Sequence, residues 1–141
     1  MGLFDAFDAS GSGLSAERLR MDVTAENLAN AQSTRSANGN GPYKRKEVVL
    51  QQAGSSFADS LSAARGGGVR VAGIVEDPTP PRRIYDPGHP DADAQGYVTM
   101  PNVNTVTEMT DLIGASRAYE ANVTAMQTAK SMFARTLDLL K

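Results

Sequence analysis

The residues best suited to chemistry lie in one loop, where the single histidine, His89, has Asp86, Asp91 and Asp93 close by in sequence. Carboxylates two residues apart can direct their oxygen atoms at one point, and a hard cation such as calcium takes oxygen ligands of this kind. The loop lacks the glycine and glutamate of an EF-hand loop, and its prolines and aspartates are typical of turns that bond to the nearby backbone. We expect a turn without metal ligands over residues 86–93, and cation binding there stays an open alternative.

A hydrolytic enzyme would need a nucleophile, a base and an acid that orients the base. Serines and aspartates are abundant, but no GxSxG turn or similar signature brings them together with the histidine. The run RGGGVR at residues 65–70 offers backbone N–H groups to a phosphate, yet it precedes a predicted strand, whereas a phosphate-binding loop precedes a helix. We therefore expect no enzyme activity, no catalytic residue and no cofactor.

Three positive charges follow an aromatic residue in the run YKRK at residues 43–46. Such runs occur in proteins that bind nucleic acids. In a chain with a net charge of −2, one isolated cluster is more typical of a solvated strand face or of ion pairs with acidic neighbours. We expect no nucleic-acid partner.

The length of 141 residues fits one modest domain, or a helical part that carries a small insert. The chain has no cysteine, which excludes disulfides, thiolate metal sites and cysteine nucleophiles. The first residues, MGLFDAFDAS, are acidic where a secretory signal is basic, and no apolar run long enough for a membrane span follows. The sequence predicts neither a cleaved signal peptide nor direct membrane insertion.

Apolar residues seven positions apart predict a long helix from about residue 3 to residue 30. The main stripe is Phe7, Leu14, Met21 and Leu28, and a second stripe is Ala16, Leu19 and Val23. Gly11 and Gly13 lie inside this helix, and each costs roughly 1 kcal/mol relative to alanine. The first turns should therefore be marginal in an isolated chain.

The same seven-residue spacing predicts a second helix over residues 107–141. One row is Leu112, Tyr119, Met126, Phe133 and Leu140; a partner row is Met109, Val123 and Leu137; a third row of small or polar residues is Ala115, Asn122, Ala129 and Thr136. Two apolar rows offset by three or four residues are typical of a coiled-coil seam. The third row would permit another helix to approach closely.

The region between the two helices is predicted to be a small β-rich insert. Short runs rich in valine and aromatic residues, bounded by proline, glycine and aspartate, are typical of strands and turns. The expected strands cover residues 43–52, 69–77, 82–86 and 97–100, with loops at residues 33–42 and 53–68.

Both predicted helices carry more apolar surface than this small polar insert can cover. Isolated amphipathic helices gain most of their stability from packing, and large exposed apolar patches mark contact surfaces. We expect the two helices to pack on each other and their remaining faces to pack on other copies or relatives of the chain.

Two terminal segments resemble the paired signatures of the flagellar axial proteins, which build the rod and hook. They are NLAN at residues 27–30 and RAYEAN at residues 117–122. The longer runs at residues 85–123 and 41–49 closely resemble one branch, the proximal-rod FlgC family. The segments match in the right order and at the right distances, and together they cover nearly the whole chain.

This resemblance implies an α+β fold in which the terminal helices pair as an antiparallel coiled coil. Residues 1–32 and 107–141 would form a discontinuous inner-rod domain, and residues 33–106 the β-rich insert with flexible loops. No role is carried over to residues 54–68. The implied function is a structural subunit of the basal-body proximal rod, a hollow drive shaft that transmits torque and forms the export channel.

The resemblance also implies partners and a location. The partners would be other flagellar rod proteins, the adaptor that joins the rod to the inner-membrane ring, and copies of the chain itself. Export would use the flagellar type III apparatus without a cleaved signal peptide, and the rod would span the periplasm. The residues expected in subunit packing are Phe7, Leu14, Met21, Asn27, Leu28, Asn30, Leu112, Tyr119, Asn122, Val123, Met126, Phe133 and Leu137.

A different class of function fits the same helices. A soluble adaptor or chaperone-like module could lay an amphipathic helix into a partner's groove. Such a module would not polymerise with like subunits, and this behaviour separates the two hypotheses.

Overall fold

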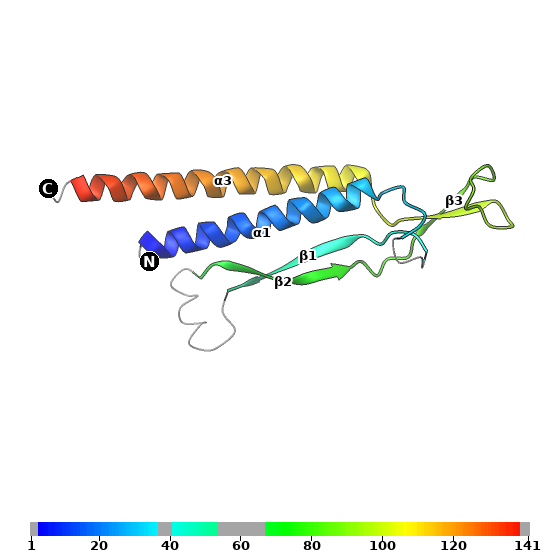
Figure 1. Cartoon of the computed structure of the whole chain (residues 1–141), viewed down its shortest axis with the longest axis horizontal. Helices are drawn as coiled ribbons and strands as arrows, with labels where there is room; N and C mark the ends of the chain where they lie inside the picture. The colour runs from blue at the N-terminus through cyan, green and yellow to red at the C-terminus, as the bar shows by residue number, and fades with distance from the viewer. Residues whose placement is uncertain (1–2, 37–40, 54–66, 139–141) are drawn as a thin grey trace.

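The computed structural model describes residues 3–36, 41–53 and 67–138, and it has an α+β architecture (Figure 1). Residues 37–40 and 54–66, which belong to the predicted loops at residues 33–42 and 53–68, and Leu140 fall outside the described residues. The elements in chain order are α1 (Leu3–Ala29), β1 (Lys46–Gln52), β2 (Val69–Glu76), β3 (Arg82–Tyr85), β4 (Tyr97–Met100) and α3 (Thr105–Asp138). Both predicted helices and all four predicted strands are thus present.

Helices α1 and α3 lie side by side and run in opposite directions (Figure 1). Asn27, near the end of α1, bonds to Glu108, near the start of α3, while Gly13 faces Asn122 further along. At about 1.5 Å per residue, α3 is roughly 51 Å long and α1 roughly 40 Å. Figure 1 shows that the longer helix continues past the described start of α1.

The side of α3 that faces α1 combines the Leu112 row with the row of small residues. Ala115 is completely buried and Glu108 is 1% exposed, while Leu112 is half-buried. Met109 and Leu137, of the row expected to complete this seam, are 53% and 48% exposed. Val123 of the same row is half-buried, so this row is covered only in part within one chain, and its role in subunit packing stays a prediction.

Helix α3 begins two residues earlier than the sequence pattern suggests, because Asn104 caps it. The side-chain Oδ1 of Asn104 accepts the N–H groups of Val106 and Thr107 at 3.0 and 3.5 Å. These are among the first N–H groups of the helix, which have no partner inside it.

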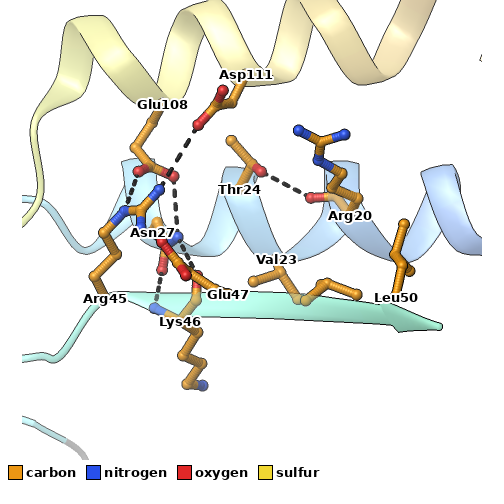
Figure 2. Close-up of a pocket in the computed structure, with 11 residues that line it drawn as sticks. Arg20, Val23, Thr24, Asn27, Arg45, Lys46, Glu47, Leu50, Glu108 and Asp111 are labelled. Carbon is orange, nitrogen blue, oxygen red and sulfur yellow. Dashed lines mark hydrogen bonds and ion pairs between the residues drawn. The ribbon is translucent and has the colours of Figure 1, made fainter. Parts of the chain in front are cut away.

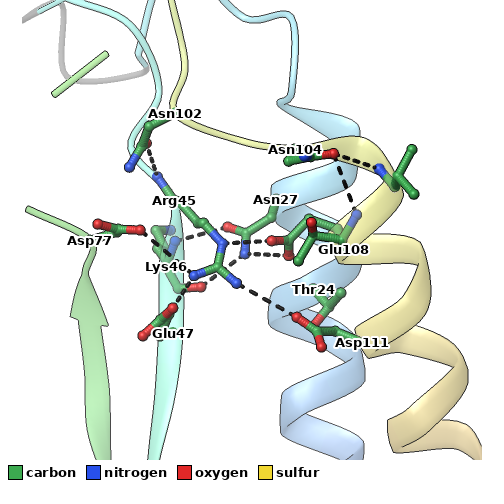
Figure 3. Close-up of polar contacts among 12 residues, drawn as sticks. Thr24, Asn27, Arg45, Lys46, Glu47, Asp77, Asn102, Asn104, Glu108 and Asp111 are labelled. Carbon is green, nitrogen blue, oxygen red and sulfur yellow. Dashed lines mark hydrogen bonds and ion pairs between the residues drawn. The ribbon is translucent and has the colours of Figure 1, made fainter. Parts of the chain in front are cut away.

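Strands β1 and β2 form an antiparallel two-stranded ribbon that packs along α1. The register places Lys46 opposite Glu76 and Gln52 opposite Val69, with an irregularity between Val49 and Leu50. In the close-up of Figure 3, β1 lies beside α1, and β2 is the outermost strand. The C-terminal half of β2 therefore has its far edge turned away from the helices.

Strands β3 and β4 form a second hairpin at the end of the molecule where α1 ends and α3 begins (Figure 1). Val98 in β4 is completely buried, whereas all four residues of β3 are exposed. Nearby, Ala31, Tyr43 and Val103 form a small apolar core. Of the helices described, neither is both long enough and apolar enough to cross a membrane.

Candidate functional site: a polar joint between two helices and a strand

The side chain of Asn27 joins three elements through four hydrogen bonds (Figure 3). Its Oδ1 accepts the Tyr43 hydroxyl and the Lys46 backbone N–H, both at 2.9 Å. Its Nδ2 donates to the Lys46 carbonyl at 2.8 Å and to Oε2 of Glu108 at 3.0 Å. Asn27 is only 1% exposed, so every donor and acceptor of a buried amide is used here.

Glu108 brings a buried negative charge to this cluster from the first turn of α3. Its Oε1 accepts a hydrogen bond from Nε of Arg45 at 2.6 Å. Partial burial lowers the pKa of the Arg45 guanidinium, but hydrogen bonds to Glu108 and Glu47 outweigh it, and the net pKa lies above the ordinary value. Asp77 and Asp111 each lie 3.7 Å from the same guanidinium. Removing one member of such a buried pair leaves the other charge uncompensated, which is strongly destabilising.

Tyr43 completes the set that we call the polar joint: Asn27, Tyr43, Arg45, Lys46 and Glu108. Burial raises the pKa of Tyr43 to about 12, and the carboxylates of Glu26 and Glu108 act in the same direction. The hydroxyl therefore remains a proton donor to Asn27 throughout the physiological pH range. Lys46 lies over the Tyr43 ring, 5.6 Å from its centroid.

The ribbon is fastened to α1 at its other end as well. The N–H of Val69 donates to the Ser12 hydroxyl at 3.0 Å, and that hydroxyl donates to the Ala9 carbonyl at 2.8 Å. Gly68 lies against Ser12 so closely that a Cβ atom at this position would overlap the hydroxyl. Asn27 and Ser12 therefore hold the two ends of the ribbon on one helix.

A hollow of about 400 Å³ lies beside the polar joint, between α1, α3 and β1 (Figure 2). Basic residues such as Arg20 and acidic residues such as Asp111 both line it, together with the apolar side chains of Val23 and Leu50. The residues that the structure describes around the hollow include no serine, cysteine or histidine. The side chains of Asn27, Arg45 and Glu108, which line it, bond to one another and connect the two helices with the start of β1.

The loop with His89 is a turn built from side-chain to backbone bonds. Asp91 accepts Thr34 Oγ1 at 2.7 Å and pairs with Arg35, and these two hydrogen bonds hold the pKa of the Asp91 carboxyl below its ordinary value. Asp93 accepts the Tyr97 N–H at 2.9 Å, which lowers its pKa, and also pairs with Arg83. Within the described residues, no group of three or more His, Asp or Glu side chains is arranged to hold a metal ion.

The charges of the YKRK run are used in ion pairs with acidic neighbours. Lys44 lies 3.1 Å from Glu76, and Lys46 lies 2.5 Å from Glu26. Arg45 belongs to the polar joint. The run therefore connects β1 to its surroundings.

The residues expected in subunit packing fall into three groups. The half-buried ones lie on both helices: Phe7, Leu14, Met21, Leu28, Asn30, Leu112, Tyr119, Asn122, Val123 and Met126. Asn27 is buried in the polar joint, whereas Phe133 and Leu137 are exposed near the end of α3. Asn30 bonds only near its own helix end, through Nδ2 to the Glu26 carbonyl and through Oδ1 from Ser33.

Sequence reasoning missed the partners of Asn27. Glu108 lies seven residues before Ala115, in the row of small or polar residues, so its spacing alone does not mark it as buried. In the sequence, Arg45 and Tyr43 stand out only as members of the YKRK run at residues 43–46. Nothing in the local sequence marks Ser12 as the contact of β2.

Comparison with known protein families finds two matching models at the two ends of the chain. The model described as flagella basal body rod protein matches residues 7–35. The model described as flagellar basal body rod FlgEFG protein, C-terminal, matches residues 94–139. These ranges contain most of α1 and α3.

Individual relatives match over the full length. The flagellar basal-body rod protein FlgC of Bacillus subtilis is 45% identical over 150 aligned residues that cover 100% of both chains. The protein of the same name from Yersinia enterocolitica is 47% identical over 139 residues, which cover 99% of this chain and 98% of the relative. The one from Salmonella typhimurium is 45% identical over the same shares of both chains.

Proposed function

Because the chain belongs to the FlgC family of flagellar basal-body rod proteins and is a structural subunit of the rod, we propose that its helices α1 and α3 pair as an antiparallel coiled coil and pack against neighbouring subunits. In this proposal the polar joint fixes the angle between that helix pair and the β1–β2 ribbon. The family is a structural one and not a class of enzymes.

The observation that carries the packing proposal is an apolar patch on α3. Val106, Met109 and Ile113 are 70%, 53% and 53% exposed, although they lie on one side of the helix within two turns. Met132 and Leu137 are exposed further along α3. Apolar side chains gathered in this way on a small protein are typical of contact surfaces.

The half-buried rows on both helices have two uses in this proposal. Their inner sides form the pair within one chain, and their flanks contact the next subunit. The residues assigned to these contacts are Phe7, Leu14, Met21, Asn27, Leu28, Asn30, Leu112, Tyr119, Asn122, Val123, Met126, Phe133 and Leu137. Of these, Asn27 acts by holding the helix ends in place.

The partners in the proposal are other flagellar rod proteins, the adaptor that joins the rod to the inner-membrane ring, and copies of the chain. The subunit leaves the cell body through the flagellar type III apparatus and lies in the periplasm, where the rod transmits torque and encloses the export channel. Residues 1–32 and 107–141 form the inner part of the rod in this proposal, and residues 33–106 lie outside it.

An aspartate in the exposed patch tests the packing role. Ile113→Asp places a charge where a neighbour is expected to bury the side chain, and should reduce the amount of the chain in purified basal bodies at least tenfold, with loss of swimming. The side chain contacts solvent in the single chain, so helix content by circular dichroism should stay within a few per cent of the unaltered protein.

The matched control is Gln127→Asp, an exposed residue about four turns further along α3. It adds the same charge outside the patch and should leave incorporation and swimming close to normal. Normal incorporation of Ile113→Asp would contradict the packing role and favour an adaptor that does not polymerise.

A further inference from the structure

One strand edge of the β1–β2 ribbon is open. The opposite edge, on β1, is occupied at Lys46, whose backbone N–H and C=O both bond to the Asn27 amide. The start of β2 is occupied at Val69 by Ser12. Towards the end of β2, Ile74, Val75 and Glu76 are exposed.

The hydrogen-bond pattern shows which backbone groups face outwards from β2. In an antiparallel pair, residues that bond across the ribbon alternate with residues that do not. Asp77 N–H donates to the Arg45 carbonyl, whereas Lys46, opposite Glu76, points its backbone groups away from β2. Alternation then turns the N–H and C=O of Glu76 and Ile74 outwards, where the described part of the chain provides no partner.

A second open edge lies on β3. The Asp86 N–H donates to the Gly96 carbonyl, while the backbone N–H and C=O of Tyr97 bond to Asp93, away from β3. Because Tyr97 lies opposite Tyr85, the same alternation turns the N–H and C=O of Tyr85 and Arg83 outwards. All four residues of β3 are exposed.

We propose that β2 of one copy pairs, antiparallel, with β3 of a second copy. The outward N–H and C=O groups of the two strands meet when Glu76 lies opposite Arg83 and Ile74 lies opposite Tyr85 of the second copy. This register places Val75 opposite Ile84. Each cross-strand pair is then complementary, because one joins opposite charges and two join apolar side chains. Exposed open edges are templates for pairing with another chain.

Within one chain β2 and β3 do not pair but belong to two different two-stranded sheets, and a proline-rich connection joins them. It contains Pro78, Pro80 and Pro81, which fix φ and lack N–H donors. Asp77 at its start accepts the Thr79 N–H at 2.8 Å and lies 3.7 Å from Arg45. The two complementary edges therefore remain available to different copies.

This contact joins unlike surfaces, so it does not close into a symmetric pair and instead adds copies head to tail. The β2–β3 contact rests on the proposed role of the chain as a rod subunit. It adds to that role the contact that the β-rich insert makes.

Cysteines provide the test, because the chain has none of its own. Val75 and Ile84 would face each other as a pair without backbone bonds, at a Cα distance of about 4.5 Å that suits a disulfide. The double variant Val75→Cys with Ile84→Cys, oxidised in purified basal bodies, should give dimers and larger multiples on a non-reducing gel. The control Val49→Cys with Ile84→Cys uses an exposed residue on β1 and should remain monomeric.

Double-variant chains that are present in basal bodies but stay monomeric overturn the edge pairing and leave the subunit role intact. A disulfide formed within one chain overturns it as well. Absence of the unaltered chain from basal bodies would instead contradict the proposed function.

A second pair of variants gives an independent measurement. Ile74→Pro removes an outward N–H that the ribbon itself does not use, whereas Ile74→Thr keeps it. The proline variant should be retained in salt-washed basal bodies several-fold less than the threonine variant. Equal retention overturns the pairing.

Discussion

At the scale of single residues, the buried side chain of Asn27 has to satisfy four hydrogen-bond partners at once. Its amide meets a hydroxyl, a backbone N–H, a carbonyl and a carboxylate, all in a space closed to solvent. Aspartate cannot replace it, because a carboxylate has no N–H for the Lys46 carbonyl and would repel Glu108. The two N–H donors and the carbonyl oxygen of the Asn27 amide match the four groups around it.

Replacing Asn27 by alanine should lower the free energy of unfolding by about 3 kcal/mol, since four polar partners lose a buried hydrogen bond. Asn30→Ala is the control, with the same chemistry three residues away and bonds only within its own helix end. It should cost about 1 kcal/mol or less. Urea titrations of the two purified variants, followed by circular dichroism, measure both values, and equal losses would contradict the role of Asn27 as a tertiary connection.

The sequence alone assigns Asn27 and Asn30 to subunit packing, and this stays a prediction. It could not predict the partners of Asn27, because Lys46 is 19 and Glu108 is 81 residues away in sequence. Periodicity reports which side of a helix is apolar, but it carries no information about which distant polar group meets a given amide.

At the scale of elements, helix and strand positions followed from local patterns, whereas the choice of seam did not. Ala115 is completely buried and Met109 is 53% exposed, although the seven-residue spacing treats their two rows alike. Gly13 belongs to the same close contact. A Cβ atom there would lie 3.0 Å from Nδ2 of Asn122, whereas one at Gly11 would lie 3.9 Å from Cε of Met126.

These two glycines therefore respond differently to alanine. Gly11→Ala should stabilise the protein by about 1 kcal/mol, the ordinary gain in a helix interior. Gly13→Ala should gain clearly less, or destabilise, because Asn122 has to move. Thermal unfolding of both variants measures the difference, and an equal gain at the two positions would show that the helices are not in close contact there.

At the scale of the whole molecule, stability is uneven. The buried residues concentrate where α1 ends, β1 begins and α3 starts, and the described residues from position 130 to the end of α3 are almost all exposed. Regions with few buried contacts open most easily. Buried contacts are therefore concentrated at one end of the molecule, and the far end of α3 has few of them.

Hydrogen exchange should report this gradient. In dilute solution, the backbone amides of residues 130–138 should exchange at least a hundredfold faster than those of residues 108–120. In purified basal bodies the difference should largely disappear, because in our proposal neighbouring subunits cover the far end of α3. Strong protection of residues 130–138 in the free chain would show that no neighbour is needed there.

The polar joint also determines when, during synthesis or export of the chain, the complete fold can form. It takes side chains from positions 27, 43, 45 and 108, so it cannot close on a chain that is threaded out from its N-terminus until the start of α3 has emerged. Before that moment Asn27 lacks one of its acceptors and Arg45 lacks its buried carboxylate. In the proposed export, with the N-terminus first, the joint would therefore form only after most of the chain has emerged.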